Sequence, residues 1–247
     1  MNWQIPRLAP GEDFPPASRA LPALSPFPGL LAAGGRLDAE TLERAYRVGI
    51  FPWFNPGEPI LWWSTDPRMV LQPQDLRVHR SLRQSARRWM RNLPSRLTLD
   101  ADFPGVMRQC GAQRESTGTW ISPSMLAAYT ELHHRGLAHS FELWEGKTLR
   151  AGLYGVCIGR MFYGESMFTD VTDGSKILLM ALCGFCLRNA IAMIDCQQQT
   201  AHLASLGATP IPRARFLEHV AQATARAPVT AWQYDWPTFQ TDCARWL

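Results

Sequence analysis

The sequence predicts an α+β protein, with a small lobe over residues 1–64 and a larger domain over residues 65–247. The domain should hold a mixed, mostly antiparallel sheet flanked by helices. Three patterns lead to this prediction. The first 64 residues are rich in proline and aromatic side chains. Two consecutive hairpins follow between residues 138 and 166, where apolar runs are separated by glycine turns. Residues 162–197 then show a strand, a helix and a second strand, which allows one parallel pair.

Composition favours a well-packed protein in a reducing compartment. Of the 247 residues, 46% are hydrophobic and 19% are charged, so we expect a substantial core. The 6 cysteines lie mostly inside apolar runs, as free buried thiols do. No apolar run reaches the length of a membrane span, and the first residues do not resemble a secretion signal. These features together predict a cytoplasmic protein.

Within the first lobe, residues 1–30 are predicted to form an extended arm and residues 38–46 a helix capped by Asp38. An aromatic stretch rich in proline and glycine follows and cannot be a regular helix. We expect Trp62 and Trp63 to fill the joint between the lobe and the domain. Trp53 lies among prolines in a loop, where its ring can stack on a base, an interaction worth about 1–3 kcal/mol.

Residues 69–78 are predicted to form a strand and residues 79–91 a helix with one basic face. Arginines recur on this face at helical spacing, and the helix contains no acidic residue. Two interpretations stay open, a solvated surface or a contact to phosphates of a nucleic acid. The basic face consists of Arg80, Arg83, Arg87 and Arg91, and the opposite apolar face of Leu82, Ala86 and Trp89.

The remaining elements follow from period, caps and turns. Ser122 and Pro123 mark the start of a helix that runs to His134. The tail carries several tryptophans and should pack back on the domain. Further strands are predicted at 96–99, 138–144, 149–158, 161–166 and 208–211, and further helices at 103–110 and 213–225.

Two acidic motifs should meet at one edge of the sheet. Glu165 and Asp195 end the two strands of the strand–helix–strand unit, and Gln197 follows closely. If those strands pair in parallel, both carboxylates leave the sheet at the same edge, where α/β sheets often place ligand clefts. Burying three such groups without partners would cost several kcal/mol in all, at roughly 2 kcal/mol or more each. We therefore expect them to form a site.

Other motifs point to structural roles, and we expect neither a metal nor a cofactor. Cys183 and Cys186 form a CxxC, but in the middle of a helix and without a second pair for zinc. His139 and His202 are isolated and read as structural histidines. Neither a serine-hydrolase elbow nor a glycine-rich phosphate loop occurs in the sequence.

Taken jointly, several motifs resemble the leucyl/phenylalanyl-tRNA–protein transferases of bacteria. The resemblance runs in one order from about residue 15 to residue 217. The motifs are Leu30-Leu31-Ala32-Ala33-Gly34-Gly35, Ala45-Tyr46-Arg47, Gly49-Ile50-Phe51-Pro52-Trp53-Phe54, Trp62-Trp63-Ser64, Asp66-Pro67-Arg68, Gly118-Thr119-Trp120-Ile121, Gly164-Glu165-Ser166-Met167-Phe168, Ile194-Asp195-Cys196-Gln197 and Ser205-Leu206-Gly207-Ala208.

The resemblance implies a larger domain with the fold of the GNAT acyltransferases. It also implies that the protein is an aminoacyltransferase.

 The implied reaction is the transfer of Leu or Phe, with Met as a further donor, from its tRNA to a protein whose first residue is Arg or Lys. By the resemblance, this addition marks the acceptor for degradation by the N-end rule. Leu-tRNA, Phe-tRNA and the acceptor protein are the implied partners of a monomeric enzyme without a cofactor.

The resemblance also suggests roles for individual residues. Asp195 would accept the proton of the attacking amine, Gln197 would bind the amine or the developing oxyanion, and Glu165 would bind the acceptor's basic side chain. The exchange of roles between Glu165 and Asp195 stays open. Stacking on the 3′-terminal adenosine is assigned to Trp53 and Trp120, tRNA phosphate contacts to Arg80, Arg83, Arg87 and Arg88, and the apolar aminoacyl pocket to Leu153, Phe162, Met167, Leu179, Leu182, Cys186 and Ile194.

Three rival functions are weighed against this one. An acetyl-CoA-dependent acetyltransferase would need a glycine-rich loop at a helix N-terminus, but residues 169–174 contain one glycine and two acids. A peptidoglycan transferase that uses aminoacyl-tRNA is disfavoured by the aromatic motifs at 51–54 and 62–64. A tRNA-binding protein with an idle catalytic centre differs only in failing to transfer an amino acid.

Overall fold

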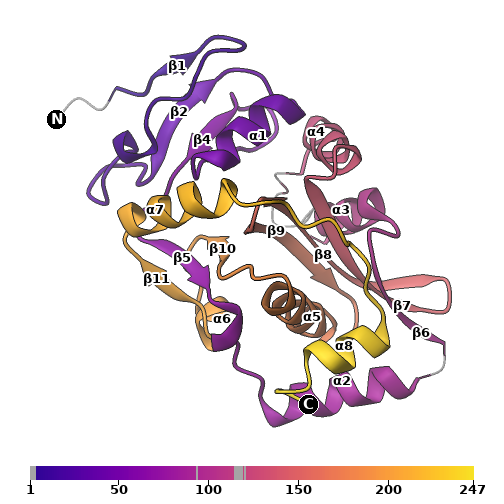
Figure 1. Ribbon diagram of the computed structural model, residues 1–247. Helices are drawn as coiled ribbons and strands as arrows, with labels where there is room; N and C mark the ends of the chain where they lie inside the picture. Colours follow the sequence, from indigo (N-terminus) through magenta and orange to yellow (C-terminus); the bar gives the residue numbers. More distant parts are fainter. Residues whose placement is uncertain (1–3, 93, 114–118, 120) are drawn as a thin grey trace.

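The computed structural model describes residues 4–92, 94–113, 119 and 121–247. It contains two sheets, one in the N-terminal lobe and a larger one in the rest of the chain (Figure 1). The predicted boundary after Ser64 falls in the link between these sheets, and we keep it as a proposal.

The N-terminal lobe is built on a four-stranded sheet in the order β1-β2-β4-β3. The arm predicted over residues 1–30 also adds a strand, because β1 pairs in parallel with β2. Asp38 caps α1 as predicted, since its side chain accepts a hydrogen bond of 2.8 Å from the Thr41 amide. The elements are β1 (Arg7–Leu8), the 3₁₀ helix η1 (Ala17–Arg19), β2 (Leu30–Gly34), α1 (Ala39–Arg47), β3 (Phe51–Pro52) and β4 (Leu61–Trp63).

The larger domain holds a seven-stranded sheet in the order β11-β5-β10-β9-β8-β7-β6. Among the described strands of this sheet, β9 and β10 are the parallel pair, and the other neighbours are antiparallel. The predicted α+β class and its mixed, mostly antiparallel sheet are thus confirmed, while the GNAT assignment stays a prediction. The strands are β5 (Arg68–Leu71), β6 (Ser95–Leu99), β7 (Ala138–Glu145), β8 (Thr148–Ile158), β9 (Met161–Thr169), β10 (Ile194–Gln197) and β11 (Thr209–Ile211).

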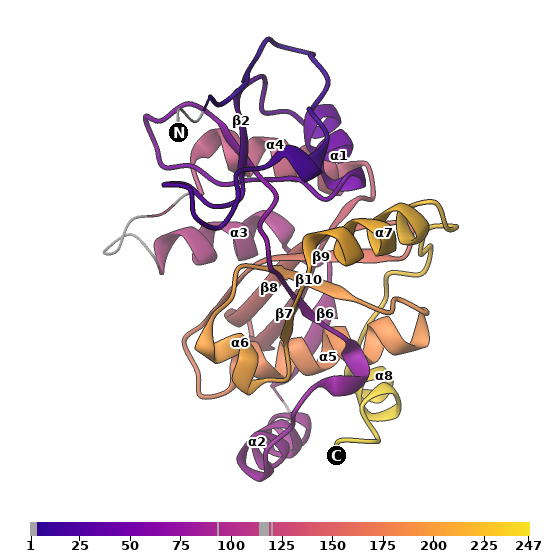
Figure 2. The ribbon, with the colours of Figure 1, turned by 90° about the vertical axis from the view of Figure 1, so that its left-hand side faces the viewer.

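Helices cover both faces of the large sheet (Figures 1 and 2). On one face α5 packs against the sheet and is covered in turn by α2 and α8. On the other face α3 and α4 pack beside α1 of the N-terminal lobe, and α7 contacts both α1 and β9. These helices are η2 (Pro73–Asp75), α2 (Arg80–Arg91), α3 (Phe103–Ala112), α4 (Pro123–His134), α5 (Gly174–Arg188), α6 (Ala201–Ser205), α7 (Arg213–Thr224) and α8 (Trp236–Asp242).

Local sequence explains several of these helices. Ser122 caps α4 by accepting from the Met125 amide at 3.2 Å. The segment predicted to be a crossover helix forms α5, which is buried on nearly every side, as its apolar composition requires. The predicted packing of the tail is also confirmed, because Tyr234 and Trp246 join the core around α5.

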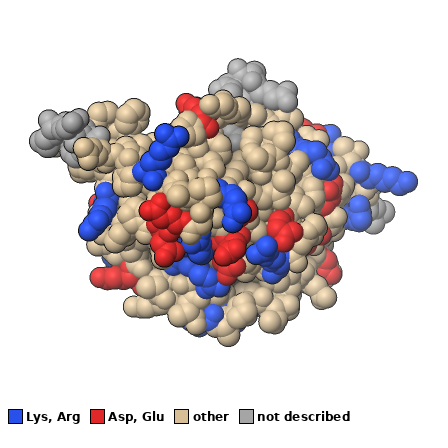
Figure 3. Space-filling view, turned by 90° about the horizontal axis from the view of Figure 1, so that it is seen from above, with Lys and Arg blue, Asp and Glu red and all other residues tan. Residues whose placement is uncertain are grey.

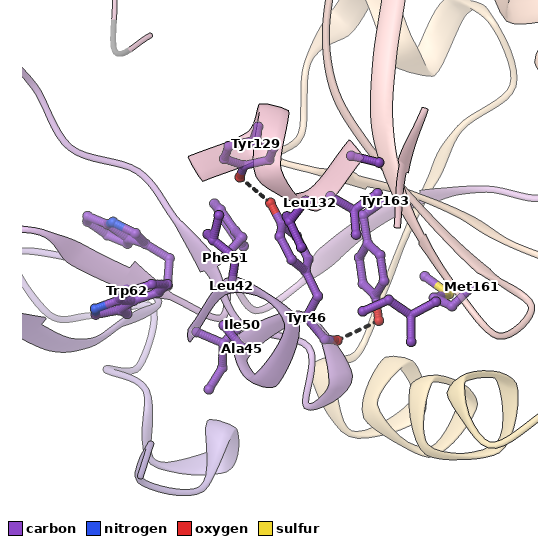
Figure 4. Close-up of a cluster of buried hydrophobic side chains, with 14 of the residues drawn as sticks. Leu42, Ala45, Tyr46, Ile50, Phe51, Trp62, Tyr129, Leu132, Met161 and Tyr163 are labelled. Atoms are coloured by element: carbon purple, nitrogen blue, oxygen red, sulfur yellow. Dashed lines mark hydrogen bonds between the residues drawn. The ribbon is translucent and has the colours of Figure 1, made fainter. Parts of the chain in front are cut away.

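One buried aromatic cluster joins the lobe to the domain (Figure 4). Tyr46 from α1 meets Tyr129 from α4 and Tyr163 from β9, and the Tyr163 hydroxyl donates to the Tyr46 carbonyl at 2.6 Å. Trp62 and Trp63 belong to the same buried core, at 0% and 8% exposure. Their ring contacts and hydrogen bonds are to Phe14, Gly34 and Trp53 of the lobe, so their role in the joint stays a prediction. The lobe and the domain therefore share packing close to the ends of β9 and β10.

Candidate active site

Two neighbouring strands carry irregularities at the predicted site. In β9, Glu165 is skipped by the pairing with β8, which passes directly from the pair Gly155–Gly164 to the pair Tyr154–Ser166. Such an extra residue is a β-bulge, which bends the strand and re-aims a side chain. Glu165 therefore leaves the alternation of its strand.

The neighbouring strand β10 has the same feature one residue before its end. Its pairing with β5 passes from Asp195 to Gln197 and skips Cys196. Gln197 also has a φ of 60°, a conformation that a residue with a side chain adopts at a cost of about 1–3 kcal/mol. The two bulges bring the predicted polar groups together, because Gln197 Nε2 donates to Glu165 Oε1 at 2.8 Å.

A pocket of about 400 Å³ opens beside these groups. Glu165, Asp195 and Gln197 lie in its wall together with apolar side chains from β8, β9 and α5. Five residues predicted for the aminoacyl pocket line it: Leu153, Met167, Leu179, Leu182 and Ile194. The other two are not brought to its wall, since Phe162 and Cys186 are fully buried in the core around α5.

Glu165 is held by hydroxyl groups from two helices. Tyr46 donates to Oε1 at 2.6 Å and Tyr129 to Oε2 at 3.3 Å, and the two hydroxyls also hydrogen-bond each other. Burial raises the pKa of Glu165 to about 7; the nearby Asp195 charge adds to this rise and the Tyr46 hydrogen bond opposes it. A half-buried carboxylate that gains and loses its proton near neutral pH is suited to acid–base chemistry.

Asp195 lies in a different environment, because Arg68 holds it from the neighbouring strand. The Arg68 Nε and Nη2 atoms donate to the two Asp195 carboxylate oxygens at 2.8 and 2.6 Å, and both side chains are 0% exposed. Asp195 Oδ1 also accepts from the Gln197 amide at 2.8 Å. Both oxygens of Asp195 are thus engaged before any substrate arrives.

Trp53, predicted to stack on adenosine, lies in the N-terminal lobe just after β3. Trp53 is 41% exposed, and the centre of its ring lies 5.5 Å from that of the buried Trp63. Trp63 also donates its indole N–H to the Trp53 carbonyl at 2.7 Å, which fixes the loop. The second predicted stacking residue, Trp120, lies outside the described residues.

The predicted basic face belongs to α2, at the end of the molecule away from the N-terminal lobe (Figure 1). Leu82, Ala86 and Trp89 are buried on the opposite side of this helix, as predicted. Arg80 and Arg88 are exposed, whereas Arg83 donates to the Trp246 carbonyl at 2.7 Å and Arg87 to a backbone oxygen of Leu247. By contrast, basic and acidic side chains are interspersed on the face at the N-terminal-lobe end (Figure 3).

Comparison with known proteins identifies the family of this chain. The family model described as leucyl/phenylalanyl-tRNA protein transferase matches residues 70–221, and the model of its N-terminal domain matches residues 35–66. The chain belongs to this family. A leucyl/phenylalanyl-tRNA–protein transferase from Cupriavidus metallidurans is 51% identical and covers 97% of this chain and 95% of its own length. One from Leptothrix cholodnii is 52% identical, with 94% and 92% covered.

The family is one of aminoacyltransferases, which confirms the predicted enzyme class. A solved structure of a conserved protein of unknown function from Bacteroides thetaiotaomicron overlaps with a TM-score of 0.37 at 14% identity. It covers 69% of this chain and 58% of its own, and the likeness is too low to bear on the fold or the function.

The resemblance in the sequence assigned no role to three residues of this candidate site. Tyr46 was expected to face inward from its helix, and a buried tyrosine needs a hydrogen-bond partner, which is the signal that could have found it. Arg68 ends the Asp66-Pro67-Arg68 motif and had no assigned role. Tyr129 lies on a helix whose sequence gave no functional signal.

Other candidate groups in the transferase have structural partners. His139 contacts the Asp100 carboxylate at 2.7 Å and stacks on Trp232, and Cys183 and Cys186 are buried free thiols. Within the described part of the chain, no group of three or more His, Cys, Asp or Glu side chains is arranged to hold a metal ion. Nor does any described helix have the length and apolar character needed to cross a membrane.

Proposed function

We propose that this transferase moves Leu or Phe from the 3′ end of its tRNA to the α-amino group of proteins that begin with Arg or Lys. Met is a further donor, and the product is marked for degradation by the N-end rule in the cytoplasm, with the enzyme acting as a monomer. The observation that carries the proposal is the pocket itself. An apolar wall suited to a Leu or Phe side chain adjoins a carboxylate whose pKa is about 7.

The reaction needs little beyond positioning and one proton carrier. The acceptor amine attacks the carbonyl carbon of the aminoacyl ester, a peptide bond forms, and the bond from that carbon to the ribose oxygen breaks. The amine releases a proton and the ribose oxygen gains one. Because the ester is already activated, neither ATP nor a metal is required by this scheme.

Of the two role assignments that the sequence left open, we propose the exchanged one, with Glu165 as the general base. Its pKa of about 7 lies close to the value of about 7.7–8.0 for an α-amine, so proton transfer between them is nearly balanced. Asp195 is less suited to this role, because Arg68 and the Gln197 amide occupy its oxygens.

The charge of the pocket also supports a cationic acceptor. Arg68 neutralises Asp195, so among the described residues of the pocket wall Glu165 is the carboxylate without a basic partner. An N-terminal ammonium group would be attracted to it. The restriction to Arg or Lys as the first residue enters the proposal through the sequence resemblance.

Gln197 and the tRNA contacts complete the scheme. The side-chain amide of Gln197 already donates to Glu165. In the reaction it would donate to the oxyanion that develops on the ester carbonyl. Trp53 would stack on the terminal adenosine. Arg80 and Arg88, both exposed on α2, would bind phosphates of the acceptor stem. Arg83 and Arg87 would join them after breaking their hydrogen bonds to the backbone of Trp246 and Leu247.

The proposal is tested with purified protein, Leu-tRNA labelled in its amino acid, and a peptide that begins with Arg. Label should move to the peptide, and it should not move to the same peptide when its N-terminus is acetylated. Peptides that begin with Lys or Ala test the acceptor rule, and Phe-tRNA and Met-tRNA test the donor range. Tight tRNA binding without any transfer would instead support the rival function, a tRNA-binding protein with an idle centre.

A further inference from the structure

Arg68 has an unusual position for a charged side chain. It is 0% exposed, and its guanidinium lies 4.6 Å from the ring centre of Phe51 and 4.5 Å from that of Phe216. Phe51 belongs to the N-terminal lobe and Phe216 to α7, so three separate parts of the chain meet at this group. Removing a full charge from water is costly, which requires that the charge be compensated locally.

The compensation comes from Asp195, which also contacts the site. One Asp195 oxygen accepts both from Arg68 Nε and from the Gln197 amide, at 2.8 Å each. Gln197 is the residue with the positive φ, and its side chain reaches Glu165. A continuous chain of hydrogen bonds therefore runs from Arg68 through Asp195 and Gln197 to Glu165.

A second contact holds the same residue from the link between the two sheets. The Thr65 hydroxyl donates to the Gln197 carbonyl at 3.0 Å. With its amide tied to Asp195 and its carbonyl tied to Thr65, the Gln197 backbone is fixed on both sides. A strained conformation persists in this way when its surroundings over-determine it.

We propose that Arg68 is a positioning residue for the transfer reaction. Through its two hydrogen bonds to Asp195, it holds the bulge of β10 so that the side-chain amide of Gln197 faces the Glu165 carboxylate. This inference rests on the proposed function. Asp195 is then an anchor and carries no proton during the reaction. Lysine cannot replace the fork, because an ammonium group offers no planar pair of donors to the two carboxylate oxygens.

A double-mutant cycle between Arg68→Lys and Gln197→Ala tests the proposal. In the otherwise unchanged enzyme, Arg68→Lys should lower kcat by at least about tenfold and leave KM for aminoacyl-tRNA nearly constant, since misplacement by 1 Å costs on the order of 100-fold. In the Gln197→Ala enzyme, the same substitution should change kcat less than about threefold, because the group that it positions is gone. A general structural defect would lower kcat by the same factor in both enzymes, and that result would overturn the proposal, as would an unchanged kcat.

Asp195→Asn provides the second variant if Arg68→Lys does not fold. It should show the same dependence on Gln197, and its rate should still rise with pH as in the unchanged enzyme. Loss of that rise would make Asp195 the general base and would reject its role as an anchor. Failure of both variants to fold would show that the pair serves folding, and the proposal would be rejected.

A crystal structure of Arg68→Lys separates this inference from the proposed function. If the unchanged protein transfers no amino acid, the proposed function fails, yet the structure still answers the question. We expect Gln197 to leave its positive φ and its Nε2 atom to move out of hydrogen-bond distance from Glu165. An unaltered Gln197 in that structure would contradict the positioning role, whatever the activity.

Discussion

Replacing Glu165 by Gln should slow transfer strongly and at the same time stabilise the fold above neutral pH. The variant keeps the shape of the side chain and an oxygen that accepts from Tyr46, but it cannot take a proton from the amine. We expect kcat to fall by about 10²–10⁴-fold, the usual contribution of a positioned general base.

The stability effect follows from the pKa of this carboxyl group. Burial raises it from an ordinary 4.5 to about 7, so between these pH values the unfolded chain has released a proton that the folded chain still holds. Stability is therefore lost as pH rises from about 4.5 to about 7. The loss amounts to roughly 3 kcal/mol, since one pH unit corresponds to about 1.4 kcal/mol. Glutamine is neutral throughout and escapes this cost.

Thermal melts of the two proteins at pH 4.5 and pH 8 measure the difference. At pH 8 the melting temperature of Glu165→Gln should be higher by about 6–12 °C, and at pH 4.5 the two should nearly coincide. Glu142→Gln is a matched control, because Glu142 is a buried carboxylate with a raised pKa that lies away from the pocket. It should leave the pH profile of transfer unchanged. Equal melting differences at both pH values for Glu165→Gln would refute the reasoning.

Three further variants probe the rest of the site. Tyr46→Phe removes a hydrogen bond that lowers the pKa of the base, so the rise of kcat with pH should move to higher pH; a shift to lower pH in a rate profile would contradict this. Trp53→Ala should raise KM for aminoacyl-tRNA, and a change confined to KM for the peptide would exclude adenosine stacking. Arg80→Ala with Arg88→Ala should reduce the slope of log Kd for tRNA against log salt by roughly 1 for each contact, and a loss that is independent of salt would argue against phosphate contacts.

Elements that depend on local signals could be predicted from the sequence. Ser122 with Pro123 places the start of α4, and Asp38 places that of α1. The helical period between two short apolar runs predicts the crossover from β9 to β10 and their parallel pairing. That pairing is also what made the meeting of Glu165 with Gln197 foreseeable.

The partners of the two carboxylates could not be predicted in this way. Asp195 pairs with Arg68, 127 residues earlier, and Glu165 with Tyr46, 119 residues earlier. Spacing along the chain carries no information about such contacts. The bulge at Glu165 is equally hidden, because the side chains of β9 show no clear alternation of polar and apolar residues that an extra residue would visibly interrupt.

These distant contacts bear on what the N-terminal lobe does. Its helix α1 supplies the Tyr46 hydroxyl that binds Glu165, and its strand β3 supplies the Phe51 ring that covers Arg68. Both contacts act on the two carboxylates that the larger domain brings to its sheet edge. A domain of residues 65–247 alone would expose Arg68 on one side and leave Glu165 without its shortest hydrogen bond. The lobe is therefore part of the candidate active site, and this accounts for the hydrophobic core that it shares with the domain.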